Sequence, residues 1–378
     1  MEPTLVGLIG CGNISNAYFA GAGRSEMIKI KACADLRVEA AKAKAEEHGV
    51  EAVSVDALLA DPDIEIVINL TVPSAHAEVS RSILDAGKHA YGEKPLATRF
   101  EDARALMDEA ERKGLRVGSA PDTFMGAAHQ ACRRLIDEGA IGRPVAGTAA
   151  VLSHGMEHWH PNPEFFFKPG GGPLLDMGPY YVTQLVNLLG PVERVTAIAG
   201  RAFETRTVTS QPLAGHKIAV EVSTTVNGIL AFRSGASIAL SASWDVWKHK
   251  RLPFELYGTD GSLLVPDPNF FGGVPEMTKD DGDWEPVAID AHPFGQPNRE
   301  MRSGSAVADY RAIGVIDMAG AIKQGRPHRA NGTLALHVLE VLESLERSSV
   351  DGRHIAIETL VERPQAVPQG HSEEVFLN

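Results

Sequence analysis

Cysteine is scarce in this chain, which holds three in 378 residues: Cys11, Cys33 and Cys132. They lie far apart and form none of the short spacings typical of zinc sites or redox pairs. Reduced thiols in a cytoplasmic protein are the simplest interpretation of so few cysteines. We therefore expect a cytoplasmic location and neither a disulfide framework nor a cysteine-based metal centre.

Long apolar runs and a surplus of positive charge are missing as well. No uninterrupted apolar stretch approaches the roughly 18 residues of a membrane-spanning helix. Met1–Thr4 leads directly into an apolar segment without a basic stretch, so we expect no signal peptide. The net charge of −13 disfavours nucleic acids and anionic membranes as partners, because phosphate contacts need a surplus of Lys and Arg on one face. The sequence predicts a soluble protein.

The first third of the chain alternates short apolar runs with helix-forming segments. The runs at 5–10, 28–34 and 64–70 are typical of buried parallel strands, and 37–47 is rich in Ala, Lys and Glu. Strands alternating with helices of about 10–15 residues predict a doubly wound parallel sheet. We assign residues 1–122 to this α/β unit.

Beyond residue 122 the pattern changes to one long helix followed by clustered strands with alternating apolar residues. Such clusters, joined by turn residues, predict an antiparallel sheet in an α+β domain over 123–378. The clearest expected elements are helices at 125–138, 307–323 and 334–347, strands at 192–201, 220–226, 228–233 and 237–242, and loops over 266–297.

A glycine-rich turn separates the first expected strand from the first expected helix. Residues 10–15 read Gly-Cys-Gly-Asn-Ile-Ser, which matches the G-x-G-x-x-G pattern except that Ser15 replaces the third glycine. Gly10 permits the tight turn, and Gly12 leaves room for a pyrophosphate against the backbone. The helix behind the turn offers free N–H groups and the positive end of its dipole. A glycine turn without a ligand is the alternative.

The cofactor's identity depends on two residues that follow the second expected strand. Asp35 stands where a carboxylate accepts hydrogen bonds from an adenosine ribose, and it would repel a 2′-phosphate. Arg37 could instead clamp that phosphate, or be an ordinary solvated arginine at a helix start. The balance favours NAD, with NADP as the alternative.

Two further segments follow strands whose carboxyl ends should meet at one edge of the sheet, where ligands bind in open α/β sheets. The first, residues 71–76, ends in His76, for which a structural or capping role is favoured over direct catalysis. The second is Glu93-Lys94-Pro95. A lysine in a cleft can polarise a carbonyl or lower the pKa of a neighbouring acid, whereas a surface salt bridge is the plain alternative.

In the second half, Asp176 and Tyr180 are four residues apart near the start of an expected helix, so they project from one face. A helix-start carboxylate and a core tyrosine are the alternative. The histidines at 154, 158 and 160 invite a metal site, but the proline-rich segment between them brings no matching carboxylate or cysteine. We expect substrate contact or loop packing there, and no metal.

Together these residues resemble the glucose–fructose oxidoreductase, inositol dehydrogenase and MocA family (Gfo/Idh/MocA) over nearly the whole chain. The most specific elements are Glu93-Lys94-Pro95 and the run Gly171-Gly172-x-x-x-Asp176-x-Gly178. The resemblance implies a Rossmann domain followed by an α/β domain whose large open sheet mediates oligomerisation, so we expect a homodimer or homotetramer.

The resemblance also implies a catalytic Lys94, a substrate-binding Asp176 and a cis peptide before Pro95. Many members carry a histidine four residues after the aspartate, where this chain has Tyr180, as glucose–fructose oxidoreductase does. A phenol beside an ammonium is a workable proton relay, because the cation favours phenolate. We expect Lys94, Tyr180 and Asp176 to be catalytic and, with His160 and Lys168, to bind substrate. The residues expected to bind the dinucleotide are Gly10, Gly12, Asn13, Ile14, Asp35, Arg37, Thr71, Pro73, His76, Glu93 and Lys94.

The function these residues imply is hydride transfer between a nicotinamide and a sugar, cyclitol or related polyol or keto-sugar. One alternative is a glycoside-cleaving enzyme that oxidises its substrate transiently with a retained NAD. Another is a non-catalytic sugar sensor, against which the joint presence of Lys94, Asp176 and Tyr180 argues.

Overall fold

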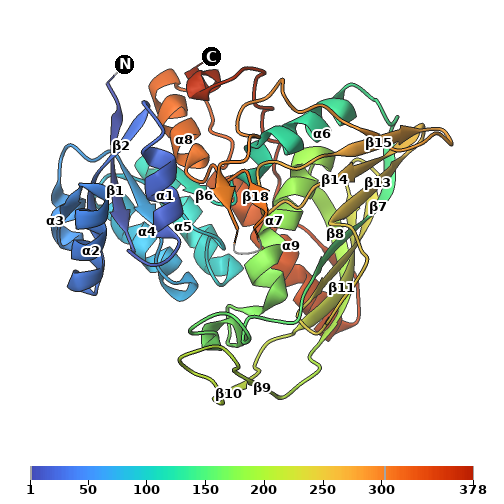
Figure 1. Cartoon of the computed structure of the whole chain (residues 1–378), viewed down its shortest axis with the longest axis horizontal. Coiled ribbons are helices and arrows are strands. Elements are labelled where there is room, and N and C mark those ends of the chain that lie inside the picture. Colours follow the sequence, from blue (N-terminus) through green and yellow to red (C-terminus); the bar gives the residue numbers. More distant parts are fainter. Residues whose placement is uncertain (1, 302–303, 378) are drawn as a thin grey trace.

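The amino-terminal unit is a doubly wound parallel sheet, as the sequence predicts (Figure 1). The computed structural model describes residues 2–301 and 304–377. The strand order β3-β2-β1-β4-β5-β6 reverses direction between β1 and β4, which marks the ligand-binding edge of such sheets. The strands are β1 (Thr4–Ile9), β2 (Ile28–Ala34), β3 (Glu51–Ala52), β4 (Ile66–Asn69), β5 (His89–Gly92) and β6 (Val117–Ser119).

Helices cover both faces of this sheet because its strands are apolar on both sides. Along β4, Ile66 and Ile68 join one buried cluster and Val67 joins another. The first cluster includes residues of α1 (Ser15–Ala22), α2 (Val38–His48) and α8 (Ile313–Gln324). The second includes residues of α3 (Val55–Ala60), α4 (His76–Asp85), α5 (Phe100–Lys113) and α9 (Gly332–Asp351).

The second unit is built on a nine-stranded sheet in the order β16-β15-β14-β13-β7-β12-β11-β8-β19. Only the β7–β12 pair in this sheet is parallel, so the expected mainly antiparallel sheet is confirmed. Its strands are β7 (Pro144–Leu152), β8 (Val192–Gly200), β11 (Thr225–Phe232), β12 (Ser237–Ser243), β13 (Phe254–Gly258), β14 (Gly261–Val265), β15 (Glu276–Lys279), β16 (Glu285–Pro286) and β19 (Ile355–Ala356).

One face of the large sheet packs against α6 (Ala127–Asp137), α7 (Gly172–Leu189) and α9. Alternation along β11 turns Val226 and Leu230 into this core, while Ile229 points to the other face and stays partly exposed. Ile198 of β8 is exposed on that face too. The other face, on which the described residues form no helix, is the one through which the family resemblance predicts oligomerisation.

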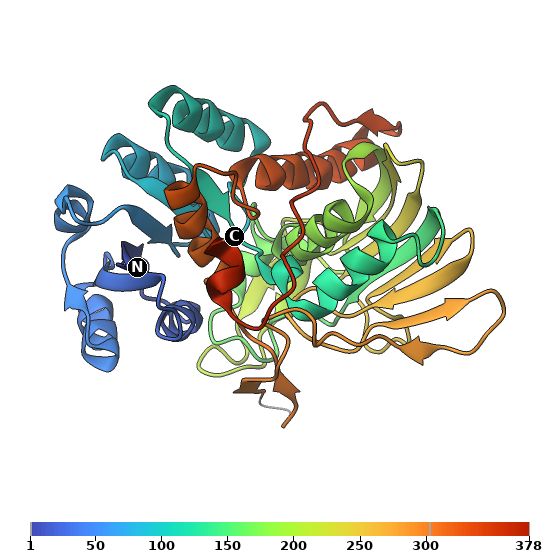
Figure 2. The same ribbon diagram turned by 90° about the horizontal axis from the view of Figure 1, so that it is seen from above.

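The carboxyl-terminal segment ties the two units together, as the view from above shows (Figure 2). Its backbone at Val367 donates to the side chain of Gln130 on α6. Further on, Glu373 accepts a hydrogen bond from the backbone N–H of Glu26, just before β2. Both α8 and this carboxyl-terminal segment return to the first unit, although they lie far beyond residue 122. The domain boundary expected at residue 122 therefore stays a prediction.

Several expected boundaries differ from those observed. The helix expected from 307 begins at Ile313, because 306–307 form a short strand, β18 (Ala306–Val307), and Ala312 adopts a positive φ of 86°. The loops expected over 266–297 contain β15 and β16 at the sheet edge. Within the described residues, no helix has the length and apolarity that a membrane crossing requires.

The smaller strands form two-stranded ribbons outside the two large sheets. They are β9 (Thr205–Thr207) with β10 (Lys217–Ala219), and β17 (Arg299–Glu300) with β18. The 3₁₀ helices are η1 (Pro73–Ala75), η2 (Thr123–Met125), η3 (Glu164–Phe167) and η4 (Glu373–Leu377).

Candidate active site

The glycine turn after β1 is shaped to receive a ligand. Gly10 has a φ of +102°, and a Cβ there would lie 2.6 Å from the carbonyl carbon of Leu70, so only glycine fits. A Cβ at Gly12 would meet nothing within 4 Å, which leaves open space beside the backbone. The Oγ of Ser15 donates to the carbonyl of Gly12 at 2.7 Å, so the residue in place of the third glycine braces the turn.

Asp35 is fixed at the end of β2 by the backbone around it. One carboxylate oxygen accepts from the N–H of Cys11 at 2.8 Å, and the other from the N–H of Arg37 at 2.8 Å. The Arg37 side chain is 77% exposed, and its Nε lies 3.7 Å from Asp35. The acid is therefore held beside the glycine turn, while the arginine is free to move.

The segment after β4 is organised by Asn69, a buried residue that the sequence analysis did not single out. Its amide donates to the carbonyl of His76 at 3.0 Å, and its Oδ1 accepts from the hydroxyl of Thr71 at 2.7 Å. The His76 ring lies 2.7 Å from the carbonyl of Pro95 and 3.0 Å from that of Thr71. Burial lowers the pKa of His76, while the two carbonyls oppose that shift, and the ring lies between the two loops at this edge.

The edge suits a dinucleotide because it combines open polar backbone with exposed apolar side chains. Leu36, directly after Asp35, is 95% exposed, and Val72, directly after Thr71, is 63% exposed. Exposed apolar groups beside a helix N-terminus and an open glycine match the mixed surface of a nucleotide. Asn13 and Ile14 lie in the glycine turn and Pro73 beside Val72, so these predicted cofactor residues share one edge.

Glu93 fixes the backbone from which the candidate catalytic lysine projects. Its carboxylate accepts from the hydroxyl of Tyr18 at 2.9 Å and from the N–H of Lys94 at 3.1 Å. The peptide bond between Lys94 and Pro95 is cis, which confirms the expectation from the resemblance.

Lys94 meets Asp176 across the junction of the two units. Its Nζ donates to Oδ1 and to the backbone carbonyl of Asp176, both at 2.8 Å. Burial by itself would lower the pKa of Lys94, but the negative charge of Asp176, with smaller contributions from Tyr180 and Glu93, raises it above its ordinary value. Lys94 is therefore a cation at neutral pH, suited to donating hydrogen bonds and stabilising negative charge rather than to acting as a base.

Tyr180 lies on the same face of α7 as Asp176. Its ring centroid is 5.3 Å from the Nζ of Lys94. Its hydroxyl accepts a hydrogen bond from Arg311 at 3.4 Å, and Arg311 in turn pairs with Asp309 at 3.0 Å. Arg311 is buried and was not predicted. The phenol therefore contacts two cations, Lys94 at its ring and Arg311 at its hydroxyl.

These side chains open into a cavity of about 570 Å³, which we call the substrate cavity. Lys94, Asp176 and Tyr180 form one wall. Aromatic side chains contribute much of the rest, and their flat apolar faces suit the C–H-bearing face of a sugar ring. The aromatic and histidine residues of the lining are His154, His158, Trp159, Phe166 and Trp247.

Two predicted substrate residues lie outside the lining of this cavity. The His160 ring packs edge-on against Phe165 and Phe166, and its Nδ1 accepts from the N–H of Asn162 at 3.1 Å. Lys168 pairs with Glu221 at 2.6 Å. The described residues contain no group of three or more His, Cys, Asp or Glu that could hold a metal ion.

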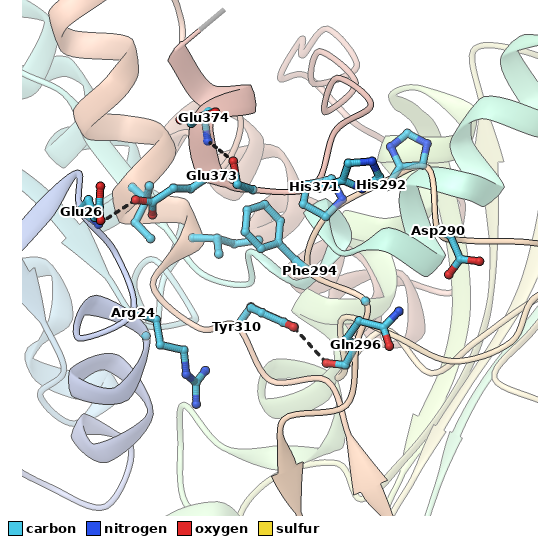
Figure 3. A pocket seen from close by; sticks show the side chains of 16 residues that line it. Arg24, Glu26, Asp290, His292, Phe294, Gln296, Tyr310, His371, Glu373 and Glu374 are labelled. Carbon is cyan, nitrogen blue, oxygen red and sulfur yellow. Dashed lines mark hydrogen bonds between the residues drawn. The ribbon is translucent and has the colours of Figure 1, made fainter. Parts of the chain in front are cut away.

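A separate cavity of about 690 Å³ lies near the opposite end of β2 (Figure 3). Glu26 and Arg24, which precede β2, line it together with Tyr310 and His292. The Tyr310 hydroxyl donates to the carbonyl of Gln296 at 3.0 Å. None of the candidate catalytic side chains lines this cavity, so we place the chemistry in the substrate cavity.

Comparison with protein families finds matches to two domain models. Residues 4–120 match the NAD-binding Rossmann-fold domain of an oxidoreductase family. Residues 129–264 match the GFO/IDH/MocA carboxyl-terminal domain.

Among characterised relatives, a 1,5-anhydro-D-fructose reductase of Ensifer adhaerens is 32% identical over 266 residues, which are 68% of this chain and 74% of that protein. A levoglucosan dehydrogenase of Pseudarthrobacter phenanthrenivorans is 27% identical over 70% of this chain and 74% of its own. Among solved structures, an NAD-binding oxidoreductase from Klebsiella pneumoniae superposes with a TM-score of 0.81 at 23% identity, over 95% of this chain and 100% of that one. A levoglucosan dehydrogenase in complex with NADH and L-sorbose superposes with a TM-score of 0.80 at 23% identity, over 94% and 99% of the two chains. These superpositions establish the fold over 94–95% of the chain.

Proposed function

This chain belongs to the GFO/IDH/MocA family of NAD-binding oxidoreductases, and we propose that it transfers hydride between NAD and a hydroxyl or keto group of a sugar or cyclitol. The observation that carries the proposal is the meeting of Lys94 with Asp176 and Tyr180 in one cavity. The similarity to sugar reductases and dehydrogenases supports the substrate class.

The dinucleotide would lie along the edge formed by Gly12, Asp35 and Thr71, with its nicotinamide toward Lys94. When bound, the nicotinamide accepts or supplies the hydride. The residues of this chain handle the proton and the orientation of the substrate.

During oxidation of an alcohol, the substrate hydroxyl loses its proton while the hydride leaves the same carbon. Lys94, held as a cation by Asp176, stabilises the negative charge that develops on that oxygen. The Tyr180 hydroxyl relays the proton: it accepts the proton of the substrate as its own passes to the solvent of the substrate cavity. Asp176 has a second carboxylate oxygen for a neighbouring hydroxyl of the substrate. In the reductive direction the same groups return the proton to the new alkoxide.

The open face of the large sheet, with Ile198 and Ile229 exposed on it, supports a homodimer or homotetramer assembled through this face. Three free, buried cysteines suit a reducing cytoplasmic location. Light scattering at micromolar concentration tests the assembly, and a monomer there would contradict it.

The activity itself is tested by following the absorbance of reduced nicotinamide with the purified protein, NAD or NADP, and a panel of sugars, inositols and keto-sugars. We expect at least one member to be oxidised or reduced with NAD. Absence of any change across the panel with either cofactor would overturn the proposal. Cleavage of a glycoside without net formation of reduced nicotinamide would replace it with transient oxidation.

A further inference from the structure

The substrate cavity adjoins a second cavity of about 590 Å³, which we call the outer cavity. The two share His154, His158 and Trp247 in their linings. The rings of His154 and Trp247 are stacked, with centroids 3.4 Å apart and planes 19° from parallel. The stacked pair therefore belongs to both cavities, and a ligand that extends from one to the other passes along it.

The outer cavity is built on a rigid arginine. Arg206, which is buried, donates to Glu157 at 2.8 Å and to the carbonyl of Trp244 at 3.0 Å, and it also bonds Asp245. Asp245 in turn accepts from the hydroxyl of Thr225 at 2.6 Å. Because the guanidinium is held from several sides, it is fixed before any ligand arrives, and binding costs little conformational entropy there.

The polar groups of this network are not all used by the protein. Within the part of the chain that the structure describes, the Nε of Arg206 and the Oε2 of Glu157 are enclosed without a hydrogen-bond partner. Enclosed polar atoms left in this state cost free energy. Because both atoms are enclosed, a buried water is the partner that would complete the network, and a ligand in the outer cavity would meet the exposed atoms of the lining instead.

The charge of the network discriminates between ligand classes. One guanidinium, Arg206, faces two carboxylates, Glu157 and Asp245, so the group is net negative. His154 adds no positive charge near neutral pH, since burial and the nearby Arg206 lower its pKa. A phosphorylated or carboxylated group would be repelled, whereas a neutral polyol would not.

Aromatic rings complete the outer cavity. The Phe203 ring lies 4.9 Å from the guanidinium carbon of Arg206 and is 48% exposed. Trp247 is 79% exposed. Ring faces beside fixed polar groups form the kind of surface that a pyranose needs, because one face of the sugar is lined by C–H bonds and its rim by hydroxyls.

We propose that the outer cavity binds the second ring of a neutral two-ring carbohydrate, a disaccharide or a glycoside, whose first ring reacts in the substrate cavity. The inference rests on the proposed function and names its substrate class. Each cavity alone falls within the roughly 300–1,000 Å³ of ordinary ligand pockets, so the pair suits a ligand of two rings. The glycosidic bond stays intact, and the balance is that of alcohol oxidation: NAD takes the hydride and the medium takes the proton.

Kinetics with matched sugars test the proposal. Glucose and xylose are compared with maltose, cellobiose, trehalose and glucose 6-phosphate, with saturating NAD. We expect the best two-ring sugar to exceed the best monosaccharide in kcat/KM by roughly tenfold or more, which corresponds to about 1.4 kcal/mol. The gain should reside mainly in KM, and the phosphorylated sugar should be the poorest.

Variants then assign the gain to the outer cavity. Phe203→Ala and Trp247→Ala should each reduce the ratio of two-ring to monosaccharide kcat/KM by roughly tenfold. Trp284→Ala removes another exposed tryptophan, which lines neither cavity, and should leave the ratio unchanged.

The outcomes separate this inference from the function on which it rests. Oxidation of monosaccharides with no advantage for two-ring sugars overturns the inference and leaves the function standing, whereas no turnover across the full panel of sugars, inositols and keto-sugars with either cofactor overturns the function. A preference for glucose 6-phosphate also overturns the inference. An unchanged ratio of two-ring to monosaccharide kcat/KM in Phe203→Ala and Trp247→Ala overturns the inference as well. If light scattering also shows that these variants dissociate, the two rings belong to a subunit contact.

Discussion

The Nζ of Lys94 lies 2.8 Å from both the carboxylate and the backbone carbonyl of Asp176, although the two residues are 82 positions apart in sequence. The lysine follows β5 of the first sheet, and the aspartate lies in the first turns of α7 beneath the second. The reacting groups therefore exist as a set only when both units are folded and docked.

Replacing the lysine should abolish most of the activity and change cofactor affinity far less, because Lys94 is only one of the residues expected to bind the dinucleotide. Lys94→Ala removes the cation that stabilises the alkoxide, so kcat should fall by roughly 10²–10⁴-fold, the usual contribution of a positioned acid–base group. Titration of NAD by fluorescence should give a similar Kd. Lys113→Ala, which deletes a lysine paired with Asp85 on the outside of the first unit, is the control and should retain kcat. A Lys94→Ala enzyme within twofold of the wild type would exclude the role.

Removing the hydroxyl of the tyrosine tests the relay. Tyr180→Phe keeps the ring and removes one long hydrogen bond from the buried, charged Arg311, which costs roughly 1–3 kcal/mol of stability. We expect kcat to drop and its pH profile to change shape, while thermal unfolding shows a folded protein. Turnover at the wild-type rate across the pH profile would reduce Tyr180 to a packing residue.

Because the space beside Gly12 is open, a substitution there should weaken NAD binding without lowering the stability of the fold. A methyl group at Gly12 meets no protein atom within 4 Å, so Gly12→Ala should unfold at the wild-type temperature yet bind NAD roughly tenfold more weakly or worse, about 1.4 kcal/mol. Gly200→Ala, also open to solvent in the structure but on β8, is the matched control. Equal NAD affinity in Gly12→Ala would show that the pyrophosphate lies elsewhere.

The acid after β2 should set the preference between the two nicotinamide cofactors. Asp35→Asn keeps an acceptor for the N–H of Cys11 but loses the charge that repels a 2′-phosphate. The ratio of kcat/KM with NAD to that with NADP should therefore fall. Arg37→Ala should lower any residual activity with NADP. A wild type that prefers NADP by about tenfold, or about 1.4 kcal/mol, would mean that Arg37 governs the site.

Asp122 should make stability fall as the pH rises. Burial raises its pKa in the folded protein to about 7, against about 4 in an unfolded chain. Between these values the folded state holds a proton that the unfolded state releases. The stabilisation is complete below about pH 4 and is lost as pH rises toward about 7, with a slope of at most about 1.4 kcal/mol per pH unit.

In Asp122→Asn this slope should disappear, because the amide oxygen still accepts the hydrogen bond from the N–H of Gly314 but cannot ionise. Urea unfolding across this pH range measures it. The exposed Asp56→Asn serves as a comparison and should follow the wild type. Parallel curves for Asp122→Asn and the wild type would rule out this titration.

The parts of the site that the sequence predicts are those encoded over short distances. The glycine turn, Asp35 and Glu93-Lys94-Pro95 each follow a strand directly, so strand order alone brings them to one edge. Asp176 and Tyr180 share a helix face through their spacing.

Arg311 is different. It acts through the hydroxyl of Tyr180, 131 residues away, and a lone arginine before an apolar helix looks like a surface residue until the packing is known. The outer edge of the large sheet escaped prediction for another reason. β15 and β16 are short strands among Pro, Gly and Asp, and pairing with a neighbour rather than local propensity creates them.

The return of α8 to the first sheet has a consequence for how the protein is made. Val315 and Met318 of this helix share a buried cluster with Ile30 and Tyr91 of the parallel sheet. The ribosome therefore synthesises all six strands of that sheet, and then nearly two hundred further residues, before it reaches α8, which helps to cover one apolar face of the sheet. The nascent amino-terminal third therefore exposes the part of that face that α8 covers until the helix is made, and such exposed apolar surface favours aggregation or chaperone binding during translation. We therefore expect the first unit to complete its folding only when synthesis of the chain is nearly finished.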